Sequence, residues 1–229
     1  MIEVNDAVKF YEHKPVLNGI SLKIRPCSIT GLLGANRSGK STLMKAITGL
    51  IRLDRGEILI DGNPPSPKTN RSIAYLPELE TLYPWMSIAN AMSYLKDFYA
   101  DWDEKKAIDL LQSFELQPDI RLRALSKGEL AKAKLLLALS RRARYLLLDE
   151  PLSGIDLHSR QQILQSLIDD FIDEEQTIVI ATHEIEVVEP YLDELLLVRQ
   201  GQLAVQGNLE ELKESRGQTL TEIIMEMHL

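Results

Sequence analysis

A glycine-rich loop, GANRSGKS at residues 34–41, limits the possible folds of this chain more than any other feature. Two glycines, a lysine and a hydroxyl stand at the spacing of a phosphate-binding loop. The loop follows the apolar stretch ITGLLG and opens the helical stretch STLMKAITGL. Backbone N–H groups and the helix dipole would therefore converge on phosphate oxygens. A strand, this loop and a helix, in this order, predict an α/β fold.

The polar residues of the loop predict a site for a nucleotide and Mg²⁺. Lys40 would reach the β- and γ-phosphates, and the Ser41 hydroxyl would bind the metal that bridges them. The alternative is a glycine-rich structural turn with a solvated lysine. We expect the nucleotide to contact the loop and the helix start at Gly34, Asn36, Arg37, Ser38, Gly39, Lys40, Ser41 and Thr42.

Two consecutive carboxylates follow an apolar stretch in YLLLDEPLSGID, residues 145–156. If this stretch is a buried strand of the same sheet, its acids lie at the carboxyl end, beside the phosphate loop. Asp149 then suits the outer shell of Mg²⁺. Because successive side chains of a strand point to opposite sides, Glu150 can face a water that attacks the γ-phosphate, and it is the candidate general base. An Asp-Glu pair alone is also common surface chemistry.

The remaining apolar patterns predict one domain in which strands and helices alternate. Strands are expected at residues 2–11, 20–24, 29–33, 57–61, 72–76, 145–150, 177–182 and 194–199. Helices are expected after a cap at Ser87, at 103–116, after Ser126 and at 159–172. We therefore divide the chain into a nucleotide-binding core, residues 1–77 and 144–229, and a helical subdomain, residues 78–143.

Charge and composition argue against several classes of protein. The formal net charge of −8 argues against nucleic acid as a partner, because affinity for its backbone comes mostly from a surplus of Lys and Arg. The single cysteine, Cys27, excludes an internal disulfide, and the amino terminus lacks the pattern of a signal peptide. No apolar run is long enough to span a bilayer. We expect a cytoplasmic protein whose role at a membrane is peripheral.

Several short stretches resemble the motifs of ATP-binding-cassette (ABC) ATPases, in the order in which that family has them. LSKGE, residues 125–129, is similar to the signature motif, whose usual form is Leu-Ser-Gly-Gly-Gln. Tyr11 resembles the aromatic residue that stacks on adenine, and Glu78 in AYLPE lies in the loop that joins core and helical subdomain. SGID, residues 153–156, resembles the D-loop, and His183 resembles the switch histidine. The alternatives are a strand-edge aromatic for Tyr11 and a capping or core histidine for His183.

The resemblance implies a fold, ligands and partners. The fold would be a P-loop NTPase core with a mainly parallel sheet, an N-terminal antiparallel β subdomain and a helical insertion that carries the signature. ATP and Mg²⁺ would be bound, with Glu78 near the metal and His183 taking part in catalysis. Two such chains would pack head to tail, so that Ser126 and Gly128 of one meet the γ-phosphate held by the other. Alternatively, Ser126 only caps its helix in a capping box with Glu129.

Four residues depart from the common pattern of the family. Lys127 replaces the first signature glycine, Glu129 the signature glutamine, Glu78 the glutamine of the linking loop, and Arg37 a glycine of the phosphate loop. None of these changes removes an essential group. A carboxylate at Glu78 can still approach Mg²⁺ or its water, although its charge would weaken direct contact with the γ-phosphate.

The function that we expect is the ATPase subunit of an ABC transporter, peripheral on the inner face of the cell membrane. It would dimerise with an identical or paralogous chain beneath a separate integral membrane permease, in an exporter-like rather than importer-like system. The apolar cluster Tyr-Pro-Trp-Met, residues 83–86, suits a contact with that permease, or else forms the core of the insertion.

Two other classes of function remain as alternatives. A soluble ABC ATPase that is not coupled to transport would keep the same motifs, although such proteins usually carry two cassettes, long coiled coils or a basic face. A metabolic kinase or GTPase would leave LSKGE without a role. His13, His158 and His228 show no metal-ligand spacing and are interpreted as surface residues.

Overall fold

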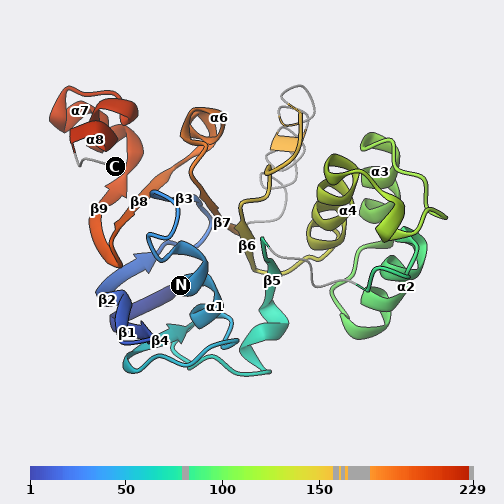
Figure 1. Ribbon diagram of the computed structural model, residues 1–229, viewed down its shortest axis with the longest axis horizontal. Helices are drawn as coiled ribbons and strands as arrows, with labels where there is room; N and C mark the ends of the chain where they lie inside the picture. Colours follow the sequence, from blue (N-terminus) through green and yellow to red (C-terminus); the bar gives the residue numbers. More distant parts are fainter. Residues whose placement is uncertain (79–82, 157–159, 161–162, 165–175, 227–229) are drawn as a thin grey trace.

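The computed structural model describes residues 1–229 except 79–82, 157–159, 161–162, 165–175 and 227–229. Its first sheet is antiparallel, in the order β2-β1-β4 (Figure 1). The strands are β1 (Ile2–Tyr11), β2 (Lys14–Ile24) and β4 (Arg55–Ile60). The strand predicted at 20–24 begins earlier, because a two-residue turn with positive φ at Glu12 and His13 lets Lys14 pair with Tyr11. This is the antiparallel β subdomain that the family resemblance implied.

The second sheet has the strand order β5-β6-β7-β3-β8-β9, and its neighbours are parallel except for β8 and β9. Its strands are β3 (Ile29–Leu33), β5 (Ile73–Leu76), β6 (Tyr145–Asp149), β7 (Thr177–Thr182), β8 (Glu194–Arg199) and β9 (Gln202–Asn208). Every residue of β3, β6 and β7 is buried, as expected for parallel strands covered on both faces. The three strands end level with one another, since Leu33 pairs with Thr182 and Asp149 with Ala181. This places the loops that follow β3, β6 and β7 at one edge.

The described part of the chain between β5 and β6, which we call the helical stretch, is mainly helical. It contains α2 (Ile88–Phe98), α3 (Glu104–Ser113), the short 3₁₀ helix η2 (Leu122–Ala124) and α4 (Lys127–Leu139). Ser87 and Asp103 cap α2 and α3, because their side chains accept hydrogen bonds from the backbone N–H groups of Asn90 and Lys106. Helix α3 is shorter than the predicted 103–116, because Asp103 is its cap and the chain leaves the helix after Ser113.

Shorter helices surround the six-stranded sheet. They are α1 (Lys40–Ile47), η1 (Thr69–Ser72), α6 (Ile185–Val188), η3 (Glu189–Tyr191), α7 (Leu209–Arg216) and α8 (Leu220–Glu226). Strand β9 and helices α7 and α8 were not predicted from the sequence. The helix predicted at 159–172 lies for the most part outside the described residues.

Two clusters of buried side chains hold the layers together. The first joins the antiparallel sheet, α1 and one face of the six-stranded sheet, with Val4, Met44 and Leu147 among its members. The second joins the helical stretch and α8 to the opposite face, and includes Leu135 and Leu148. Consecutive residues of β6, Leu147 and Leu148, thus belong to different clusters, because successive side chains of a strand point to opposite faces.

The buried side chain of Arg141 links the helical stretch to the six-stranded sheet, and we call its set of contacts the Arg141 clamp. The Arg141 guanidinium donates to both carboxyl oxygens of Asp101, at 3.1 and 2.9 Å, and to the carbonyl oxygens of Ile73 and Arg71, at 2.6 and 2.7 Å. It also lies 3.7 Å from the centre of the Tyr99 ring. Asp101 belongs to the α2–α3 connection and Ile73 to β5, so one side chain joins the two parts.

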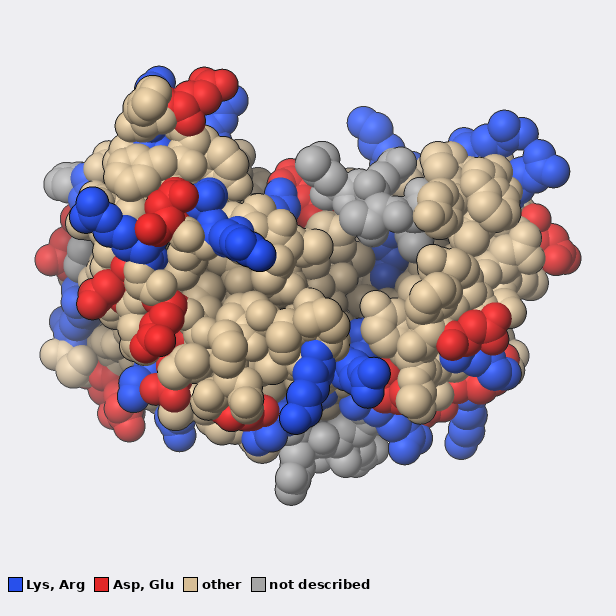
Figure 2. All heavy atoms as spheres, turned by 90° about the horizontal axis from the view of Figure 1, so that it is seen from below, with Lys and Arg blue, Asp and Glu red and all other residues tan. Residues whose placement is uncertain are grey.

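The surface carries charges of both signs. On the face seen from below in Figure 2, acidic and basic side chains lie mainly around the edges, and the middle of the face is mostly covered by other residues. In the part of the chain that the structure describes, no helix combines the length and the apolar character needed to cross a bilayer.

Candidate functional site

The phosphate loop lies between β3 and α1, as predicted, and two of its glycines are required by close contacts. Gly34 has φ 153° and a Cβ there would stand 2.2 Å from the carbonyl oxygen of Val198. Gly39, the residue before α1, has φ 113°, and a Cβ there would stand 2.7 Å from the carbonyl oxygen of Val16. Any side chain at these positions would displace backbone. The backbone of the loop can therefore follow this path only with glycine at both positions.

Lys40 lies buried at the start of α1. Its ammonium donates to the carbonyl oxygens of Gly34 at 2.7 Å and Ala35 at 3.2 Å, and lies 3.9 Å from Glu150 Oε1. Burial lowers the pKa of Lys40, and nearby carboxylates, Glu150 first among them, oppose that shift. The hydrogen bonds of the ammonium thus go to neutral carbonyl oxygens, which phosphate oxygens can replace.

Two further residues of the loop show unusual features. The Ser38 hydroxyl is buried and has no hydrogen-bond partner among the described residues. Such an orphaned polar atom is rare in proteins and fits a ligand oxygen. Arg37 is exposed at the tip of the loop, with φ 67° in the left-handed region that non-glycine residues seldom adopt. Backbone strain of this kind often marks functional loops.

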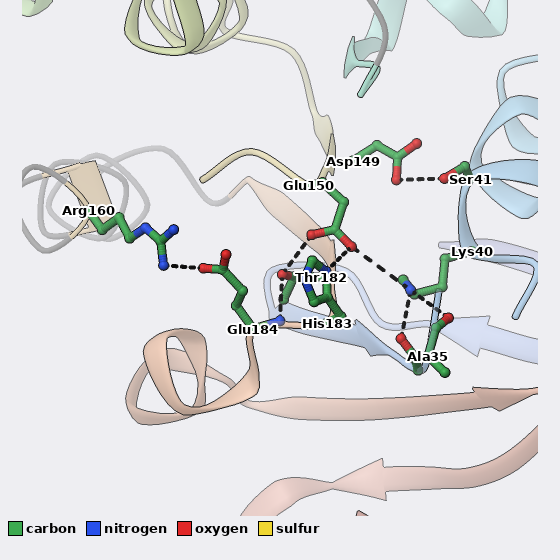
Figure 3. Close-up of polar contacts among 10 residues, drawn as sticks. Ala35, Lys40, Ser41, Asp149, Glu150, Arg160, Thr182, His183 and Glu184 are labelled. Carbon is green, nitrogen blue, oxygen red and sulfur yellow. Dashed lines mark hydrogen bonds and ion pairs between the residues drawn. The ribbon is translucent and has the colours of Figure 1, made fainter. Parts of the chain in front are cut away.

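Asp149 is the last residue of β6 and lies directly behind the loop. Ser41 Oγ donates to its Oδ1 at 3.0 Å (Figure 3). Tyr75 OH lies 3.5 Å from its Oδ2. Burial raises the pKa of Asp149, the Ser41 hydrogen bond opposes that shift, and the nearby carboxylates of Glu78 and Glu150 add to it. A cation at Ser41 and Asp149 would relieve this accumulation of negative charge.

Glu150 turns out of the sheet with φ 49°, a left-handed conformation. Its Oε2 accepts a hydrogen bond from Thr182 Oγ1 at 3.0 Å, and its Oε1 lies 2.9 Å from His183 Nδ1 (Figure 3). Thr182 Oγ1 in turn accepts the backbone N–H of Glu184 at 3.0 Å, and the Glu184 carboxylate pairs with Arg160. The carboxylate of Glu150, which follows β6, is therefore held by residues at the end of β7.

Most of the predicted site residues line one cavity of 580 Å³. Its lining comprises Tyr11, Val16, Asn36, Arg37, Ser38, Gly39, Lys40, Ser41, Thr42, Glu78, Glu150, Ser153 and His183. Gly34 and Asp149 stand behind this lining, in contact with Lys40 and Ser41. Ser153 belongs to the stretch that resembles the D-loop, whereas Val16, Tyr75 and Thr182 were not predicted to belong to the site. For Thr182 a signal existed, because this polar residue directly follows the four apolar residues 178–181 at the end of the strand.

Two predicted residues, Ser126 and Gly128, are not among the described residues that line this cavity. Ser126 caps α4 and forms the expected capping box with Glu129. A Cβ on Gly128 would stand 3.4 Å from the carbonyl oxygen of Gly154, so the signature stretch and residues 153–156 pass close to each other. The structure thus brings together the phosphate loop, the acids of β6 and His183, and it places the start of α4 outside that group.

The oxygen ligands near the loop fit Mg²⁺. Among the described residues, no three His, Cys, Asp or Glu side chains gather as one metal site. Mg²⁺ beside a nucleotide usually needs only one or two protein ligands, because phosphates and water supply the others. Ser41 Oγ and Asp149 Oδ1, 3.0 Å apart, can serve as these ligands or hold a bound water.

A family model described as "ABC transporter" matches residues 17–153. The chain belongs to the ABC transporter family. It is an ABC ATPase cassette, as the sequence motifs predicted. The ABC transporter ATP-binding protein YtrB of Bacillus subtilis is 32% identical over 216 residues, which make up 93% of this chain and 74% of that protein.

Two further relatives of the cassette are named for opposite directions of transport. The lipopolysaccharide export system ATP-binding protein LptB of Haemophilus influenzae is 28% identical, and the match covers 93% of this chain and 92% of that protein. The cobalt import ATP-binding protein CbiO of Salmonella typhi is 29% identical, and the match covers 90% of this chain and 80% of that protein.

Solved structures confirm the fold of the cassette. The ATP-binding subunit of an ABC transporter superposes with a TM-score of 0.90 and 25% identity, over 100% of both chains. A dimeric bacterial ABC transporter cassette superposes with a TM-score of 0.81 and 22% identity, over 91% of this chain and 99% of that one.

Proposed function

We propose that this cassette is the ATP-hydrolysing subunit of an ABC transporter, attached to a separate membrane permease on the cytoplasmic face of the cell membrane. The observation that supports the proposal is the 580 Å³ cavity in which the phosphate loop, Glu150 and His183 meet. We further propose that residues 1–77 and 144–229 act as the nucleotide-binding core, and residues 78–143 as the helical subdomain.

The phosphate loop would bind the β- and γ-phosphates of ATP. Lys40 would exchange its two carbonyl partners for phosphate oxygens, and the unpaired Ser38 hydroxyl would donate to another. Ser41 and Asp149 would hold Mg²⁺, which offsets the charge of the phosphates when it is bound. Tyr11, on the wall of the same cavity, would stack on the adenine ring.

Glu150 would act as the general base. A base must lie within hydrogen-bond reach of the water that it deprotonates, and Glu150 faces the cavity with both carboxyl oxygens fixed by Thr182 and His183. It would take a proton from the attacking water, while His183, held at Glu150 Oε1, would stabilise the charge of the γ-phosphate. Glu78, on the same wall, would approach the metal or its water.

A second copy of the chain, or a paralogue, would complete the site. Ser126 and Gly128 stand at the exposed start of a long helix, where backbone N–H groups favour an anion, and they do not line the cavity of their own chain. In a head-to-tail dimer they would face the γ-phosphate of the partner. A solved cassette with the same fold is dimeric, which supports pairing of two chains.

The permease would contact an aromatic surface of the helical stretch. Tyr83 and Trp85 are 52% and 60% exposed, and their rings stack with centres 5.8 Å apart. Tyr94 and Phe98 of α2 extend this surface, which borders a 330 Å³ groove between the core and the helical stretch. Met86 is only 6% exposed, so it belongs to the core of the insertion instead. Exposed aromatic side chains in such a group often mark protein contacts.

Two further parts of the proposal are the direction of transport and the coupling of ATP hydrolysis to transport. Exporter-like transport stays a prediction, because relatives named for export and for import match this chain to a similar extent. A soluble ABC ATPase that is not coupled to transport is the second candidate. It would use the same cavity but would leave the aromatic surface without a partner.

Two variants test the ATPase directly. Lys40→Ala should abolish binding of ATP with Mg²⁺, whereas Glu150→Gln should retain binding and lose hydrolysis, because only the base is removed. Glu186→Gln, an exposed carboxylate in α6 outside the cavity, is the control and should retain both. Equilibrium nucleotide binding and steady-state phosphate release separate the cases. Hydrolysis at the wild-type rate in Glu150→Gln would show that another group is the base.

A further inference from the structure

The hydroxyl of the signature serine is already occupied within its own chain. Ser126 Oγ donates to Glu129 Oε2 at 2.7 Å, and the Ser126 backbone N–H donates to the same oxygen at 2.8 Å. The Glu129 N–H in turn donates to Ser126 Oγ at 3.3 Å. Both the proton and one lone pair of the hydroxyl are therefore engaged by a single residue one helical turn away.

This arrangement conflicts with the role that the proposed function gives to Ser126. A hydroxyl has one proton, and it cannot donate that proton to Glu129 and to a phosphate of the partner at the same time. A hydrogen bond to a carboxylate is roughly twice as strong as one to a neutral acceptor, so its loss opposes the exchange. Glu129 also adds a negative charge where the phosphate would arrive, and this charge acts more strongly once closure excludes water.

We propose that Glu129 is a positioning residue that restrains Ser126 and thereby weakens closure of the ATP-bound dimer. The inference rests on the proposed function, in which Ser126 meets the partner's γ-phosphate. Closure would require the Ser126 hydroxyl to turn from Glu129 to the phosphate in both sites of the dimer. The closed state would then form at a higher protein concentration than a neutral residue at position 129 would allow.

Glutamine at position 129 separates this restraint from the capping of the helix. Ser-x-x-Gln forms a capping box as Ser-x-x-Glu does, so Glu129→Gln should leave the start of α4 intact. The amide oxygen is a neutral acceptor, which releases the hydroxyl more readily and adds no charge near the phosphate.

The chain contains a matched control in the second capping box, at the start of α8. Glu222 Oε2 accepts the Thr219 N–H at 2.7 Å and the Thr219 hydroxyl at 2.9 Å, and the Glu222 N–H donates to Thr219 Oγ1 at 3.3 Å. The three bonds match those of Ser126 and Glu129, but α8 lies at the opposite end of the molecule from α4 (Figure 1). Glu222→Gln thus makes the same chemical change away from the proposed phosphate contact.

The experiment measures the dimer dissociation constant by sedimentation equilibrium with ATP and Mg²⁺, in the Glu150→Gln background that keeps ATP intact. Adding Glu129→Gln should lower this constant by on the order of tenfold, because a charge-assisted bond no longer has to be broken in either site. Adding Glu222→Gln should leave it unchanged. The melting temperatures of the two glutamine variants should agree with that of the background.

A double-mutant cycle tests whether Glu129 acts through Ser126. With Ser126→Ala present, Glu129→Gln should tighten the dimer by a smaller factor, because no hydroxyl remains to be released and only the removal of the Glu129 charge still acts. A gain of the same size in this background, or an unchanged dissociation constant with Ser126 intact, overturns the inference while the proposed function stands. If Glu150→Gln with ATP stays monomeric in every variant, the proposed dimer fails and the restraint fails with it.

Discussion

The Arg141 clamp predicts that two neighbouring arginines contribute very differently to the free energy of unfolding. Arg141 pairs with Asp101, and Arg142 pairs with Asp103 through two hydrogen bonds of 3.0 and 2.7 Å. The side chain of Arg141 is 5% exposed and that of Arg142 is 64% exposed. Two ion pairs with almost the same sequence spacing therefore lie in very different surroundings.

Arg141→Met should lower the free energy of unfolding by about 3 kcal/mol, the lower end of the range for removing one partner of a buried ion pair. We take the lower end because Asp101 is 25% exposed and regains some contact with water. The carbonyl oxygens of Ile73 and Arg71 also lose their donors. For a protein of this size, such a change lowers the melting temperature by about 6–12 °C.

Arg142→Met should cost at most about 1 kcal/mol, because Arg142 itself is exposed and Asp103, whose side chain is 13% exposed, keeps the backbone N–H of Lys106 as a donor. Differential scanning calorimetry of both variants and the wild type measures the difference. Methionine suits both positions because its unbranched chain replaces the arginine stem without charge. Equal losses for the two variants, or a melting temperature of Arg141→Met within about 2 °C of the wild type, would refute the reasoning that burial makes the clamp strong.

Three further outcomes follow from the site and its surroundings. Thr182→Val should lower kcat by about tenfold with little change in ATP binding, because Glu150 loses a hydrogen bond of 3.0 Å, and Thr182→Ser should restore most of the activity. Trp85→Ala should weaken copurification with the permease and leave the melting temperature unchanged. Met86 is buried, so Met86→Ala should instead lower the melting temperature by several degrees. The reverse pattern would assign Trp85 to the core. A mixture of Ser126→Arg and Lys40→Ala subunits should regain ATPase activity that neither has alone, since one site of their heterodimer carries neither defect. Heterodimers that form but stay inactive would contradict a contact between subunits.

The parts of the fold and site that the sequence predicted depend on contiguous residues. The phosphate loop, the acids after β6 and the caps at Ser87 and Ser126 each form from a few neighbouring positions. The buried strands were also predictable, because their apolar runs are long and end at polar or glycine residues. In these stretches local preference and tertiary packing favour the same structure.

The parts that the sequence did not predict depend on contacts between distant residues or carry little apolar signal. Thr182 became a partner of Glu150 only because β6 and β7 are neighbours, which no local pattern reveals. Strand β9 has Val205 as its one fully buried residue, and α7 has only Leu209, so neither shows a clear period. The run at residues 83–86 was interpreted as one cluster, but the turn that starts at Tyr83 divides it, with Trp85 exposed and Met86 buried.

The strand order of the second sheet has a consequence for synthesis of the chain on the ribosome. In the part of the chain that the structure describes, β3 pairs with β7 and β8, both of which come from the last third of the sequence. The antiparallel sheet, by contrast, has all of its strands once β4 has emerged. Strand β3, which precedes the phosphate loop, therefore cannot pair with its neighbours until Thr177 and the residues after it have left the exit tunnel. A nascent chain that stops before β7 holds every residue of the loop but lacks both strands that pair with β3.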